Sequence, residues 1–144
     1  MFEKRNVHVS SRIVCAAVLA FVTVATACQR AQKFQGVEIK VVDVQQMKQL
    51  GPQPGGIASV SAGPANKFVR VRLEIIWSGE QQELTLAQSD LELTDAEGKK
   101  YQGGVFPVSP SSGGKKTTTE EIAFVVPNNA QPKTFCIGKT CFTL

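Results

Sequence analysis

Between residues 68 and 77, apolar side chains alternate almost without interruption with charged or polar ones. One face carries the apolar residues Val69, Val71, Leu73, Ile75 and Trp77, and the other carries Arg70, Arg72 and Glu74. A period of two is typical of a strand with one buried face and one wet face, as in antiparallel sheets. After residue 27, no window of a dozen residues shows a convincing helical period. The sequence therefore predicts an all-β domain.

Other parts of the chain repeat this pattern between Gly- and Pro-rich turns. Strands are expected at residues 37–41, 84–86, 91–93, 99–102 and 117–126, with a further short one near 58–61. Residues 42–50 are expected to form at most a short helical turn. Short strands separated by turn signals favour an antiparallel β-sandwich.

The N-terminal residues show the features of a secretory signal. Lys4, Arg5 and Arg12 precede an uncharged apolar run at residues 13–27, which ends in small residues. The run is too short for a permanent span of a hydrocarbon core about 30 Å thick. We expect a cleaved signal helix at residues 1–27, a polar tether at 28–35 and one domain at 36–144.

Cys28 directly follows this run, and residues 25–28 resemble the lipobox of bacterial lipoproteins, although Ala25 stands where Leu is usual. The exported chain keeps Cys28, Cys136 and Cys141, an odd number, and acylation of Cys28 would leave one even pair. We expect a lipid-anchored protein at the cell membrane or, because Gln29 follows, at the outer membrane. The alternative is ordinary signal cleavage, which gives a secreted or periplasmic soluble protein.

The histidine and charge counts limit the chemistry of the exported chain. His8 is the one histidine and lies in the signal, so a Ser-His-Asp or Cys-His centre is excluded and the commonest metal ligand is missing. Without residues 1–27, thirteen Lys and Arg face eleven Asp and Glu, and no long basic stripe appears. We expect no enzyme, no metal, no cofactor and no nucleic-acid partner.

Acidic residues gather at 90–97, where Asp90, Glu92, Asp95 and Glu97 fall within eight positions. Their spacing is not that of an EF-hand loop. Asp90 and Glu92 would share one strand face, and Asp95 and Glu97 would flank a turn. Structural positions in a β-hairpin are therefore favoured for these four residues over a calcium site.

Cys136 and Cys141 flank Gly138 and Lys139, which can form a two-residue II′ turn. Such a hairpin places the two cysteines opposite each other, with Cα atoms about 4.5 Å apart. A structural disulfide is predicted, in preference to a redox centre or a zinc site.

Three segments resemble the immunoglobulin-like domain of a bacterial lipoprotein family of unknown function: Lys67 to Ile75, Ser89 to Tyr101, and Ile122 to Pro127. The resemblance spans about residues 36–144 and implies an immunoglobulin-like β-sandwich, with no catalytic residues. Trp77 and Tyr101 are expected to pack in the core and the hairpin, with possible exposure of one of them for recognition.

The expected function is a non-catalytic binding or structural interaction module at the cell envelope, with membrane lipid at Cys28 and an unknown protein partner. One alternative is a small-ligand or ion-binding extracytoplasmic protein, with residues 51–66 or 103–116 as its mouth. A histidine-independent hydrolase is a weaker alternative.

Overall fold

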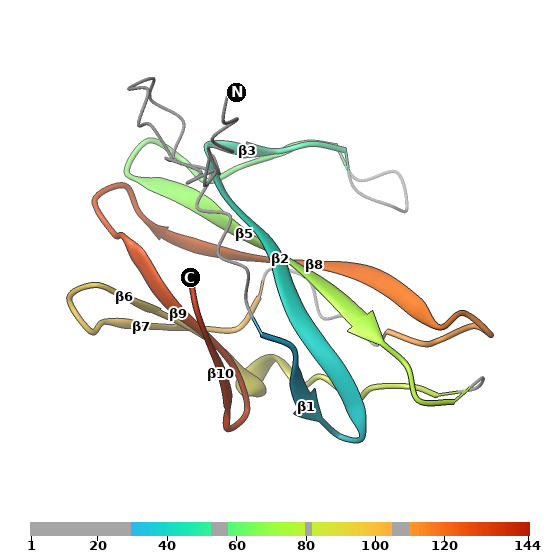
Figure 1. The fold of residues 1–144 in the computed structure, drawn as a ribbon. Helices are drawn as coiled ribbons and strands as arrows, with labels where there is room; N and C mark the ends of the chain where they lie inside the picture. Colours follow the sequence, from blue (N-terminus) through green and yellow to red (C-terminus); the bar gives the residue numbers. More distant parts are fainter. Residues whose placement is uncertain (1–29, 53–57, 80–81, 105–109) are drawn as a thin grey trace, which may run out of the picture.

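The computed structural model describes residues 30–52, 58–79, 82–104 and 110–144. They form two antiparallel sheets packed face to face, with a small two-stranded ribbon beside them (Figure 1). This is the expected fold class, an antiparallel β-sandwich of the immunoglobulin-like kind. The predicted signal helix at residues 1–27, and Cys28, lie outside the described residues.

Each main sheet has four strands. The first sheet has the order β1 (Gln32–Phe34), β2 (Val37–Met47), β5 (Asn66–Ile76) and β8 (Thr117–Pro127). The second has the order β10 (Thr140–Thr143), β9 (Pro132–Ile137), β6 (Leu91–Asp95) and β7 (Lys100–Gln102). The ribbon pairs β3 (Gln49–Leu50) with β4 (Val60–Ser61), and a 3-10 turn, η1 (Gln88–Asp90), precedes β6.

The core lies between the two sheets and is made by the alternating inward residues of both. On β5 the predicted inward residues are buried, and on β8 Ile122, Phe124 and Val126 are buried as expected. Phe135 is at the centre, packed edge-on against Phe124 at 5.9 Å and stacked on Phe142 at 6.0 Å. Since aromatic pairs add stability beyond their buried area, these three rings hold the sheets together.

The strand β2 is longer than predicted, and the expected helical turn at residues 42–50 is wrong. A bulge between Val41 and Asp43 shifts the register against β5. The extra residue moves the apolar positions from the odd to the even numbers, so that Val44 packs on the core after Val41. A bulge breaks the period of two in the sequence while the strand continues.

A second apolar cluster covers one end of the outer face of the first sheet. Its buried members are Phe68 on β5, Ala123 on β8 and Leu50 on β3, and Met47, Val60 and Ala62 pack against them. The β3–β4 ribbon thus shields a part of the sheet that a simple two-layer sandwich would leave in water.

The strand expected at residues 84–86 does not form. Leu84 and Leu86 are buried in the core, but this segment makes only an isolated bridge between Glu83 and Ser111. The apolar alternation predicted correctly that Leu84 and Leu86 are buried. A strand also needs a neighbouring strand that pairs with it over several residues, and this segment has none among the described residues.

The polar tether expected at residues 28–35 is wrong in its second half, where Gln32–Phe34 form β1 and pair with β2. The turn between these strands has positive φ at Gln35 and Gly36, as a two-residue I′ hairpin turn requires. The domain therefore begins no later than Gln32.

Candidate functional site

The hairpin of β9 and β10 carries the predicted disulfide on the outer face of the second sheet. Cys136 is paired with Cys141 and Ile137 with Thr140, and the Cα atoms of the two cysteines are 4.0 Å apart. Gly138 has a φ of 57° and Lys139 a negative φ, the combination of a II′ turn. The structure thus brings these two site residues together as the sequence predicted.

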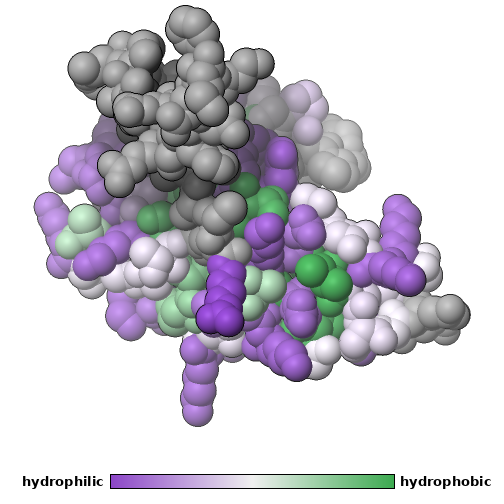
Figure 2. Space-filling model, in the orientation of Figure 1, coloured by the Kyte–Doolittle hydropathy of each residue, from purple (hydrophilic) through white to green (hydrophobic). Residues whose placement is uncertain are grey.

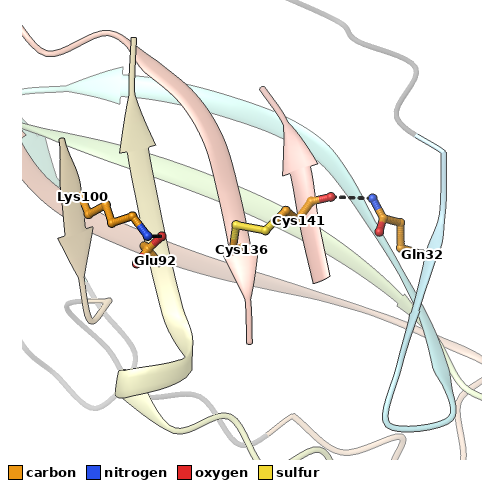
Figure 3. Close-up of a disulfide and its surroundings, with 5 residues drawn as sticks. All are labelled: Gln32, Glu92, Lys100, Cys136 and Cys141. Atoms are coloured by element: carbon orange, nitrogen blue, oxygen red, sulfur yellow. Dashed lines mark hydrogen bonds and ion pairs between the residues drawn. A yellow bond between two sulfur atoms is a disulfide. The ribbon is translucent and has the colours of Figure 1, made fainter. Parts of the chain in front are cut away.

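This disulfide belongs to a row of side-chain links that runs across the sandwich (Figure 3). Gln32 on β1 donates from Nε2 to the carbonyl oxygen of Cys141 at 2.6 Å, which joins the first sheet to the second. Beyond Cys136, Glu92 on β6 forms an ion pair with Lys100 on β7 at 3.0 Å. Each strand of the second sheet takes part in one of these links, and backbone pairing of Glu92 with Cys136 joins β6 to β9.

Asp95 has a structural role at the β6–β7 turn. One carboxylate oxygen accepts the backbone N–H groups of Glu97 and Lys99 at 3.0 and 2.9 Å, and the other accepts the hydroxyl of Tyr101 at 2.9 Å. Burial raises the pKa of Asp95, but these hydrogen bonds and the charge of Lys99 outweigh it and lower the pKa overall. Burial and Asp95 raise the pKa of Tyr101 to about 12.

The four carboxylates at residues 90–97 do not converge. Asp95 holds the turn and Glu92 is paired with Lys100. In the described ranges, no group of three His, Cys, Asp or Glu side chains could hold a metal ion. The hairpin interpretation therefore accounts for Glu92 and Asp95.

Trp77 and Tyr101 were the two candidates for exposed recognition, and the structure gives both a packing role. Trp77 is 5 % exposed and donates from Nε1 to Thr118 Oγ1 at 2.9 Å. Tyr101 packs against the core, its hydroxyl is bound to Asp95, and Lys99 Nζ lies 5.5 Å from its ring centre. Recognition through Trp77 is thus contradicted, because a partner could not reach its ring.

The outer face of the first sheet carries a charged network that the sequence reasoning did not assemble. Arg72 donates to Glu121 Oε1 from both Nε and Nη2, at 3.0 and 2.9 Å, and Arg70 donates to Oε2 at 3.2 Å. Arg70 also donates to the amide oxygen of Gln45 on β2. The alternation of β5 and β8 predicted the outward faces of these residues, but only the register Arg72 to Glu121 makes them neighbours.

Two lysines lie at the end of the sandwich where β5 begins. Lys48 donates to the carbonyl oxygen of Asn66 at 2.9 Å and to Asn128 Oδ1. Lys67 is 9 % exposed, and within the described residues no hydrogen bond or ion pair compensates its ammonium group. Burial, and then the charge of Lys48, lower the pKa of Lys67.

An open hollow of about 650 Å³ lies beside the bridge between Glu83 and Ser111. It is lined by Gln82, Glu83, Ser111, Ser112, Gly113 and Gly114. Ser112 and Gln82 bond to each other through N–H···O contacts of 2.8 and 3.0 Å. Ser111, Ser112, Gly113 and Gly114 belong to the loop 103–116, the expected mouth of the alternative ligand-binding function, and Gln82 and Glu83 come from the segment bridged to it.

A search of the described part of the chain for a long apolar helix able to cross a membrane finds none. No protein-family model matches the sequence, and no curated protein matches it. A solved structure of an uncharacterized β-sandwich protein from Clostridium difficile 630 is similar, with a TM-score of 0.55 and 14% sequence identity. The alignment covers 81% of this chain and 89% of that one. At this identity the similarity shows the fold, and the protein is a β-sandwich.

Proposed function

We propose that this protein is an exported, lipid-anchored β-sandwich that acts at the cell envelope as a non-catalytic binding or structural interaction module. The observation that carries the proposal is the pairing of Cys136 with Cys141. Disulfides persist in oxidising compartments, which supports export. The pairing also leaves Cys28 as the odd cysteine of the expected mature chain, available for acylation.

The non-catalytic part of the proposal rests on what the polar residues do. Asp95, Glu92 and Glu121, the carboxylates best placed for chemistry, are each engaged in holding strands or a turn. The space between the sheets is filled by apolar side chains. The resemblance to an immunoglobulin-like lipoprotein domain supports the same function, because that family brings no catalytic residues.

Mass spectrometry of the protein isolated from its native membranes tests the anchor and the disulfide together. We expect the mass of residues 28–144 plus acyl groups and minus two protons. Exchange of Cys28 for serine should release the protein from the membrane fraction, whereas exchange of the exposed Lys115 for serine should leave it there. A mature chain with an unmodified Cys28 would overturn the lipid anchor.

The hollow beside Glu83 favours a second candidate, a small-ligand or ion-binding protein. Its test is a thermal-shift screen of the purified protein against small polar ligands and divalent ions. A stabilisation that Glu83→Gln abolishes would support this function over the first.

A further inference from the structure

The first strand of the domain, β1, begins four residues after Cys28 in the sequence and lies beside the β9–β10 hairpin. We call residues 30–36 and 132–144 the β1–β10 flank. Gln32 on this flank bonds to Cys141, and the ring of Phe34 lies near Gly138 in the hairpin turn. The two segments are therefore neighbours in space, although a hundred residues separate them in the sequence (Figure 1).

The short chain between Cys28 and β1 limits where an anchored domain can sit. Four residue steps from Cys28 to Gln32 span at most about 14 Å. Gln32 pairs with Ile39, and β2 continues from there to Met47, a distance of about 26 Å at the rise of a strand. Because about 14 Å is less than about 26 Å, an anchor at Cys28 cannot extend beyond the Met47 end of the sandwich. The anchored domain therefore cannot stand upright on the bilayer with that end down.

Across the sheet the reach of the tether does not select an edge, because it equals the distance between the two edges. Strands β1 and β8 are the two edges of the first sheet, three strand spacings or about 14 Å apart. If the flank lies at the lipid surface, β8 is on the side that faces away from it. The choice between the two edges therefore depends on their charge.

Charge distinguishes these two edges. The β1–β10 flank contains Arg30, Lys33, Lys133 and Lys139, all exposed, and its two segments contain no Asp or Glu; the exposed Glu38 on β2 is the cross-strand neighbour of Lys33. Strand β8 contains Glu120 and Glu121 and no Lys or Arg, and its Glu121 is paired with Arg70 and Arg72 of β5. Basic residues next to an anchor are attracted to anionic lipid headgroups within about a Debye length of the surface. In the view of Figure 2 hydrophilic residues dominate the surface, with only separate hydrophobic patches.

We propose that the β1–β10 flank is a membrane-docking surface that binds anionic lipid headgroups and holds the sandwich on its side, with β8 turned away from the bilayer. This inference rests on the proposed anchor at Cys28. It adds an orientation and a lipid class, which leaves the outer edge β8 and its neighbours available to other molecules of the envelope.

The test uses the full acylated protein, reconstituted into vesicles of phosphatidylcholine alone or with about one third phosphatidylglycerol. A donor dye is attached through p-azidophenylalanine at Thr143 on β10 or at Thr119 on β8, both exposed positions. The acceptor dye is on a lipid headgroup. We expect more energy transfer from position 143 than from 119 in the anionic vesicles, and a smaller difference in neutral vesicles or high salt.

A charge-reversal pair identifies the surface. Lys133→Glu with Lys139→Glu should remove the difference between the two dye positions, whereas Lys115→Glu with Lys116→Glu, two exposed lysines outside the flank, should keep it. Unchanged emission of Trp77 shows that the variants are folded. Equal transfer from both positions, or more from 119, overturns docking while the protein still floats with the vesicles. A chain without acyl groups that does not float overturns the anchor, and the docking with it.

Discussion

The hydroxyl of Tyr101 donates a hydrogen bond to Asp95 Oδ2 at 2.9 Å, while the other oxygen of this carboxylate caps the turn between β6 and β7. The two residues are six positions apart on the two strands of one hairpin. Since the carboxylate is the acceptor of three hydrogen bonds, its ionised form is favoured in the folded state. The same bond favours the protonated form of the tyrosine. Acid therefore weakens this interaction by protonating Asp95, and strong base weakens it by deprotonating Tyr101.

Tyr101 is the one tyrosine of the chain, so its titration can be followed directly. Phenolate absorbance of the folded protein should titrate with a pKa of about 12, against about 10 in denaturant. Because the folded pKa is the higher one, the stability from this group is complete below pH 10 and is lost as the pH rises towards 12. A folded protein that titrates as it does in denaturant would contradict the hydrogen bond to Asp95.

Replacement of Asp95 by asparagine should lower the melting temperature by several degrees at neutral pH. The pKa of Asp95 is lowered on folding from its ordinary value of 3.8, so its contribution is complete above that value and is lost as the pH falls through the folded pKa. The difference between wild type and variant should therefore shrink in acid. Tyr101→Phe is the control, since it removes one bond and leaves both turn N–H groups capped. A difference that does not depend on pH would contradict the ionic role.

Loss of the disulfide should destabilise the domain by about 2 kcal/mol, the loop-entropy value for a ring of this size. Cys136→Ser with Cys141→Ser removes the bridge without leaving a free thiol in the hairpin. The measurement is denaturant unfolding followed by the emission of Trp77, the one tryptophan, which is buried in the core. Reduction of the wild type should give the same loss, and an unchanged midpoint after reduction would argue against the bridge.

Gly104 lies so close to β8 that a side chain does not fit. A Cβ at this position would be 2.7 Å from Ile122 Cγ2. Gly104→Ala should cost about 1–3 kcal/mol, because Ile122 is fully buried and cannot move away freely. Gly51→Ala is the matched control, since its Cβ would meet no atom within 4 Å. Equal unfolding midpoints for the two variants would contradict the packing of Gly104 on β8.

Lys67→Met should raise the melting temperature at neutral pH. The variant keeps the buried stem and removes an ammonium group that lacks a partner among the described residues. The pKa of Lys67 is lowered on folding from 10.5, so the penalty is complete below the folded pKa and fades as the pH rises from that pKa through 10.5.

The exposed Lys115→Met serves as control and should leave the melting temperature unchanged. A lower melting temperature for Lys67→Met would show that the ammonium is favourably bound in the folded protein.

By itself, the sequence determined the faces of β5 and β8 and the disulfide hairpin. The alternation from Val69 to Ile75 predicts the buried face without knowledge of distant contacts, because successive side chains of any strand point to opposite sides. The turn at Gly138 and Lys139 likewise fixes its own register over a few residues. Local chemistry is sufficient at both places.

Only the tertiary structure decided which strand covers which face and where polar groups find partners. The bulge after Val41 is accommodated by pairing with β5, and Gln32 becomes part of β1 because β2 and β10 lie beside it. Phe68, on the wet face of its strand, is buried because the β3–β4 ribbon lies over it. Burial and hydrogen bonding depend on residues far away in the chain, and a period of two carries no information about them.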